Sequence, residues 1–253
     1  MANIGTILTA ATIWVAVVFS GCKENILTIP LAYSDATFVM MSDTCTDSSC
    51  NVSDCGGVQI LLKRFDTTLP SGRMLNRELT AFYIRKLADS ERSQKPLTLL
   101  EASRQFLQAA ADVRREMPDA PTTWTALGSD SVYRADSIVC VGQSIYMYTG
   151  GAHGSNTTRY VTINVNSNKF VTWRDLIRDT NRFRDAAEKA FRKEYGMTSS
   201  DTYESRGFWF TDNRFSLPRE VGVNNRGYIL HYGQYEIAPY SMGEIVVSVP
   251  YTE

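Results

Sequence analysis

Histidine is scarce in this chain: only two, His153 and His231, occur among 253 residues. A Ser-His-Asp hydrolase needs a histidine as its general base, so one of these two would have to serve. The nearest approach to a nucleophile motif, Gly142-Gln143-Ser144, lacks the second glycine of G-x-S-x-G and lies within an expected strand. The sequence therefore predicts no catalytic triad.

An excess of charge of either sign is also missing. The 26 Lys and Arg residues nearly balance the 27 Asp and Glu residues, and the formal net charge is -1. This balance provides no electrostatic attraction for nucleic acid or for an anionic membrane surface. We therefore expect no nucleic-acid partner, and the apolar fraction of 43% is ordinary for a globular chain.

Nucleotide and metal motifs are absent as well. Gly150, Gly151 and Gly154 form G-G-x-x-G, but this pattern joins two expected strands and carries no G-K-[ST]. Three cysteines spaced C-x4-C-x4-C lack the C-x2-C pair of common zinc sites and have no histidine nearby in sequence. We expect no cofactor, and for these cysteines we favour disulfides over a metal site or free thiols.

The N-terminus has the features of a secretion signal. Its apolar run, Ile4 to Phe19, is too short for a transmembrane helix and has the length of a signal-peptide core, although no Lys or Arg precedes it. Phe19-Ser20-Gly21-Cys22 then resembles a bacterial lipobox. We expect residues 1–21 to be removed, Cys22 to carry lipid and residues 22–32 to form a tether. A buried first helix and an uncleaved anchor are the alternatives.

Cysteine usage agrees with an oxidising compartment. If Cys22 carries lipid, four cysteines remain: Cys45, Cys50, Cys55 and Cys140. They can form two disulfides, and three pairings are possible. Cys140 lies on an expected strand, on the face opposite Val139 and Val141. We therefore expect it to meet the cysteine-rich loop there.

Hydrophobic periodicity predicts an α+β fold with two small units, each an antiparallel sheet covered by one or two helices. In the first unit, residues 33–149, Thr98 and Glu101 form a T-x-x-E capping box for the better marked helix. The expected strands here are 36–41, 57–65, 122–133 and 137–149, and the expected helices are 74–87 and 99–117.

The second unit is expected at residues 150–253, with the boundary near the glycine cluster unless the sheet continues across it. A strand is expected at 160–165, followed by a short helix at 172–177 and an amphipathic helix at 181–195 that ends at Gly196. The remaining expected strands are 208–210, 214–217, 227–232 and 244–249.

Two motifs carry a resemblance to a known family. Gly150-Gly151-Ala152-His153-Gly154, followed by Tyr235-Glu236-Ile237-Ala238-Pro239-Tyr240 and a closing strand ending in Val249-Pro250-Tyr251, resembles the extracytoplasmic domain pair of the RsiV and PdaC proteins. These are bacterial envelope proteins with paired domains of unknown function. The resemblance covers roughly residues 33–251. It extends to the module that these families share, and neither to the sigma-factor-binding segment of RsiV nor to the deacetylase domain of PdaC.

The resemblance implies a lipid-anchored protein of the bacterial cell envelope, facing the periplasm or the cell exterior and acting by binding. The implied ligand is peptidoglycan glycan or a lysozyme-like protein. The candidate binding residues are those of the two motifs: Gly150, Gly151, His153, Gly154, Tyr235, Glu236 and Tyr240. An enzyme with a site near His153 and Glu236 is the alternative, as is a purely structural lipoprotein.

These residues also have structural interpretations. His153 can hold the glycine loop through hydrogen bonds to backbone carbonyls. Pro239 requires a bend, in which Glu236 can cap backbone amides and the tyrosines can pack a corner or form an aromatic rim for a partner. The enzyme hypothesis requires His153 and Glu236 to converge within hydrogen-bond reach.

Overall fold

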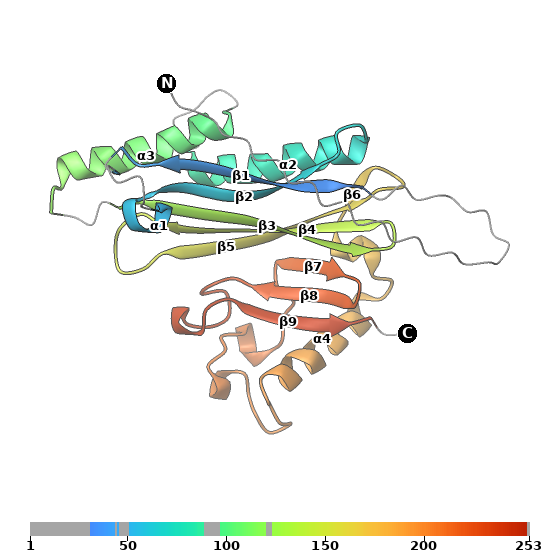
Figure 1. Ribbon diagram of the computed structural model, residues 1–253. Helices are drawn as coiled ribbons and strands as arrows, with labels where there is room; N and C mark the ends of the chain where they lie inside the picture. Colours follow the sequence, from blue (N-terminus) through green and yellow to red (C-terminus); the bar gives the residue numbers. More distant parts are fainter. Residues whose placement is uncertain (1–30, 44, 46–50, 89–96, 120–122, 252–253) are drawn as a thin grey trace.

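The computed structural model describes residues 31–43, 45, 51–88, 97–119 and 123–251. The expected signal peptide, the lipidation site Cys22, most of the tether and Cys50 lie outside the described residues. Within the described part, the chain forms four layers: two helices, a six-stranded sheet, a three-stranded sheet and a further helix (Figure 1). No helix in these ranges has the length and hydrophobicity needed to cross a membrane.

The larger sheet contains the first six strands in sequence order. Its members are β1 (Tyr33–Met41), β2 (Gly57–Phe65), β3 (Thr125–Ala135), β4 (Ile138–Tyr148), β5 (Ser155–Asn164) and β6 (Lys169–Val171). A one-turn helix, α1 (Val52–Cys55), precedes β2. The mixed α+β class predicted from the sequence is confirmed.

The prediction that this sheet is wholly antiparallel is wrong, because β2 and β3 run parallel with Gly57 opposite Thr125. Two helices, α2 (Pro70–Leu87) and α3 (Leu99–Glu116), connect these strands. A connection of this length returns the chain to the end of the sheet at which β2 begins, and β3 can then run parallel to β2.

Both connecting helices lie on one face of the sheet and bury their apolar stripes there (Figure 1). Leu75, Leu79 and Tyr83 of α2 are almost completely buried. The capping box predicted for α3 is present: Thr98 accepts from the backbone of Glu101, whose carboxylate accepts from the Thr98 backbone. Helix α2 begins four residues earlier than expected, at Pro70, a residue whose fixed φ suits the first turn.

The smaller sheet has the order β7 (Glu220–Asn224), β8 (Gly227–Tyr232) and β9 (Ile245–Pro250). Helix α4 (Thr180–Glu194) covers the face turned away from the larger sheet (Figure 1). Short 3-10 turns lie around these elements: η1 (Trp173–Leu176), η2 (Glu204–Arg206), η3 (Thr211–Asn213) and η4 (Tyr240–Met242). Gly196 has a φ of 57° just beyond α4, as expected for a C-terminal cap.

The strands predicted at 208–210 and 214–217 are absent. Phe208, Phe210 and Phe215 are buried in irregular segments around Phe191 of α4, while Trp209 is 54% exposed. These segments pack their phenylalanine rings into the core without joining a sheet.

The boundary predicted near residue 150 does not separate two sheets. The glycine turn joins β4 to β5, which pair along their length from Ile138 opposite Asn164 to Met147 opposite Ser155. The sheet therefore continues across this turn, and the smaller sheet begins only at β7.

Cys140 is not placed to bridge the described cysteines of the expected disulfide set. It lies near the start of β4 and is a free cysteine, and its Sγ accepts a hydrogen bond from the Val223 amide at 3.4 Å. The loop bearing Cys45 and Cys55 adjoins Gly57, which is aligned through β3 with Tyr148 at the other end of β4. Eight residues of strand span roughly 27 Å, far more than a disulfide permits. Pairing within the cysteine-rich loop stays a prediction.

Candidate functional site

Two segments far apart in the sequence meet at one corner of the molecule. His153 comes from the β4–β5 turn, and Tyr235 and Tyr240 come from the loop between β8 and β9. The His153 and Tyr240 rings are stacked with centroids 3.8 Å apart, and the Tyr235 ring centroid lies 5.7 Å from that of Tyr240. We call His153, Tyr235 and Tyr240 the aromatic corner.

Hydrogen bonds fix the corner to the glycine turn. The Tyr240 hydroxyl donates to the Gly154 carbonyl at 3.0 Å, and His153 Nδ1 lies 3.0 Å from the same oxygen. Because a carbonyl only accepts, the proton of His153 belongs on Nδ1, and in the neutral ring Nε2 can accept from the Tyr235 hydroxyl at 3.4 Å. The three rings are therefore oriented before any ligand arrives.

The glycines of this turn are required for two different reasons. Gly150 and Gly151 have φ values of 89° and 91°, which side chains rarely adopt. Gly154 is buried, and a Cβ there would lie 2.3 Å from the ring of Tyr146. The three glycines predicted as binding residues thus shape the turn and let Tyr146 cover it.

The corner is open to solvent although it is well fixed. Tyr235 is 53% exposed, and it adopts a left-handed φ of 64°. A non-glycine residue in this conformation costs of order 1 kcal/mol and persists where its surroundings hold it. An exposed ring held in this way can contact a ligand at little further cost in conformational entropy.

Glu236 is exposed, but its carboxylate is occupied by the backbone. Its carboxylate accepts hydrogen bonds from the backbone amides of Gly233 at 2.8 Å and Arg219 at 3.3 Å. No hydrogen bond joins it to His153, although both residues are described, so the pair required by the enzyme hypothesis is not formed. Glu236 acts as the backbone cap that the sequence allowed, and Ile237 and Ala238 beside it are buried.

A polar network beside the corner ties the two sheets together, and no sequence pattern predicts it. Glu244 contacts His231 Nε2 at 2.9 Å and accepts from the Thr158 hydroxyl at 3.1 Å and from the Asn156 amide. Burial favours the neutral form of Glu244, but these three partners outweigh it and lower the pKa of the carboxyl. His231 is a buried residue of β8, and its ring is used in this network.

This network predicts a pH dependence of stability. Because folding lowers the pKa of Glu244, its contribution to the free energy of unfolding is complete above the unfolded value of 4.5 and is lost as the pH falls through the folded value. We expect the stability difference between wild type and Glu244→Gln to shrink on acidification. Urea unfolding between about pH 3 and pH 7 measures this, with the exposed Glu194→Gln as control. A difference that stays constant over this range would contradict the assignment.

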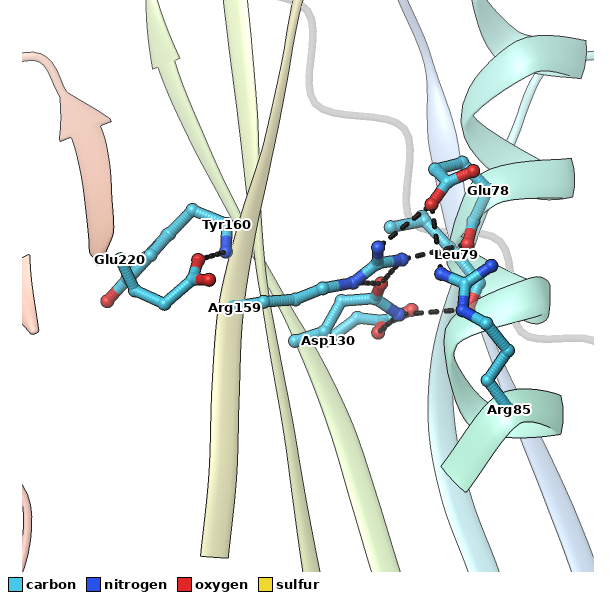
Figure 2. Close-up of polar contacts among 8 residues, drawn as sticks. Glu78, Leu79, Arg85, Asp130, Arg159, Tyr160 and Glu220 are labelled. Carbon is cyan, nitrogen blue, oxygen red and sulfur yellow. Dashed lines mark hydrogen bonds and ion pairs between the residues drawn. The ribbon is translucent and has the colours of Figure 1, made fainter. Parts of the chain in front are cut away.

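A second polar cluster lies on the helix-facing side of β5. Figure 2 shows Arg159 reaching toward α2, where it donates to the Glu78 carboxylate and carbonyl, each at 2.8 Å. It also donates to the fully buried Gln143, which in turn donates to Asp130 at 2.9 Å. On the other side of the strand, the Tyr160 amide meets Glu220 of the smaller sheet. These donors and acceptors satisfy one another, and the cluster is structural.

Comparisons with known proteins identify a domain in the C-terminal part of the chain and relatives of the fold. Residues 174–252 match the model of DUF3298, a protein family of unknown function. The fold resembles a DUF3298 family protein from Pseudomonas aeruginosa PAO1, with a TM-score of 0.61, 21% identity, and coverage of 88% of this chain and 91% of that one. A DUF3298 family member from Bacteroides fragilis NCTC 9343 gives a TM-score of 0.60 at 15% identity, with the same coverages. No curated protein matches the sequence. Residues 174–252 therefore form a DUF3298 domain within a fold shared with these two structures.

Proposed function

We propose that this protein acts by binding and not by catalysis, and that its ligand is the glycan of the bacterial cell wall. The observation that supports this most directly is the aromatic corner. His153 and Tyr240 are held by the Gly154 carbonyl, and Tyr235, which contacts His153, is accessible. Such rings offer apolar faces together with hydroxyl and imidazole groups at their edges. Sugar rings have the complementary chemistry, with C–H faces and hydroxyl edges.

The cellular setting of the proposal rests on the sequence. The lipobox-like Phe19-Ser20-Gly21-Cys22 and the resemblance to the RsiV and PdaC domain pair support a lipid-anchored protein of the cell envelope. An anchor of this kind would hold the aromatic corner on the outer side of the membrane, where wall material is available.

The binding proposal predicts the effect of removing the most exposed ring. Tyr235→Ala deletes the side chain of a residue that is 53% exposed, and within the described ranges its hydroxyl has one hydrogen-bond contact, to His153. We expect the affinity for soluble wall glycan to fall about tenfold, since an exposed stacked aromatic contributes of order 1–2 kcal/mol. Isothermal titration calorimetry with purified, lysozyme-digested peptidoglycan fragments measures the change.

The matched control is Tyr33→Ala, which removes another exposed tyrosine, 42% accessible, from the edge strand β1. Its affinity should equal that of the wild type. Equal affinities for wild type and Tyr235→Ala would reject the corner as the site. Binding of lysozyme itself, lost in Tyr235→Ala, with no binding of glycan would keep the corner and replace the ligand by a wall-degrading protein.

A further inference from the structure

A groove lies at the opposite end of the smaller sheet from the aromatic corner. Its volume is about 500 Å³, and it is lined by the segment before α4, the first turns of α4, and the ends of β8 and β9. The corner adjoins the end of β8 after Tyr232, whereas Tyr228 near the start of β8 lines the groove. The two sites therefore share no residue, and this volume is within the range of small-ligand pockets.

About half of the groove wall is apolar. Ile177, Phe183 and Val249 contribute aliphatic and aromatic surface, and Tyr228 and Tyr251 pack edge to face with centroids 5.3 Å apart. Both tyrosine hydroxyls are already used: Tyr228 donates to the Leu176 carbonyl and Tyr251 to the Asn224 carbonyl. Neither hydroxyl is therefore available as a donor to a ligand, although each oxygen can still accept a hydrogen bond.

The two positive charges at the groove have no partner in the described part of the chain. Arg178 and Arg182 line the groove, and neither guanidinium has a hydrogen bond or ion pair within the described residues. The one acid in the lining, Asp179, caps α4 by accepting from the amides of Asn181 and Arg182 at 3.0 Å. An anion therefore meets two free guanidinium groups, while the helix start itself is already capped by a carboxylate.

We propose that this groove binds the free C-terminal carboxylate of a short peptide with small apolar side chains. The guanidinium groups of Arg178 and Arg182 take the carboxylate, and the apolar wall takes the last side chains. This site is distinct from the aromatic corner and does not depend on the glycan proposal. If both hold, the protein recognises the sugar and the peptide of wall material at separate places.

The test uses N-acetyl-trialanine with a free carboxylate and the same peptide as its C-terminal amide, titrated calorimetrically against the purified protein. We expect saturable binding of the carboxylate form and about tenfold weaker binding of the amide, because a charge-assisted contact is lost. Arg178→Gln and Arg182→Gln should each weaken binding of the carboxylate form by a similar factor.

Arg184→Gln is the matched control, since Arg184 is exposed on the same helix, does not line the groove and pairs with Asp185 at 3.6 Å. It should bind like the wild type. Equal binding of acid and amide, no binding of either, or an equal loss in Arg184→Gln would overturn the proposal. Inorganic phosphate that competes fully at equal concentration would replace the peptide by a simple anion and overturn it as well. Tyr235→Ala should leave peptide binding unchanged, so failure here is distinguishable from failure of the glycan site.

Discussion

Asp130→Leu should lower the free energy of unfolding by about 3–5 kcal/mol, because it leaves several buried donors without an acceptor. The Asp130 carboxylate is 6% exposed and accepts from the Tyr83 hydroxyl at 2.6 Å, the Gln143 amide at 2.9 Å and the Lys63 backbone amide at 3.0 Å. Leucine has a similar size but accepts none of these bonds. Urea unfolding followed by circular dichroism measures the loss.

The state of Tyr83 supports this expectation. Burial and the neighbouring Asp130 raise the pKa of its hydroxyl above the usual range, so it remains a protonated donor. The matched control is Asp35→Leu, which removes an exposed carboxylate whose partner, Lys63, is the residue that also donates its amide to Asp130. We expect this control to change stability by at most about 1 kcal/mol. Similar losses in both variants would show that the Asp130 network is not the cause.

Phe191→Ala should lower the free energy of unfolding by about 3–5 kcal/mol. Phe191 of α4 is fully buried, and its ring contacts six other aromatic rings. These belong to Tyr195, Tyr203, Phe208, Phe210, Phe215 and Tyr232. The surrounding rings come from different segments, so they cannot all move inward to fill the cavity, and the lost contacts are not recovered.

The comparison for this variant is Phe170→Ala on β6, where the ring is 41% exposed. Its unfolding free energy should stay within about 1 kcal/mol of the wild type. Thermal and urea unfolding of the two variants, measured side by side, separate the loss of a packed ring from the loss of any phenylalanine. A Phe191→Ala protein as stable as Phe170→Ala would contradict the assigned core.

Local patterns in the sequence predicted the elements that depend on local physics. The capping box at Thr98, the amphipathic helix ending before Gly196 and the strand 57–65 all formed where expected, because periodicity and caps act over a few residues. Strand β7 is not predicted because it is only five residues long and contains Gly222, a residue that weakens strand propensity. That glycine is needed where the Tyr160 ring of the other sheet approaches, since a Cβ there would lie 2.5 Å from it.

The candidate site was predictable in part for the same reason. Glycine and proline marked both loops of the corner, and the structure brings His153, Tyr235 and Tyr240 together. The orientation of Glu236 toward backbone amides was one of two open interpretations, and only the fold decided it. The arginines of the groove carried no sequence signal, because their significance depends on which strand ends lie beside them.

The central claim is that the aromatic corner is a preformed binding surface, and aromatic side-chain NMR during titration with soluble wall glycan tests it most directly. The account predicts saturable shifts for His153, Tyr235 and Tyr240, with the groove ring Tyr228 unaffected. Binding that leaves these three resonances in place, or the absence of any binding at saturating glycan, would contradict it.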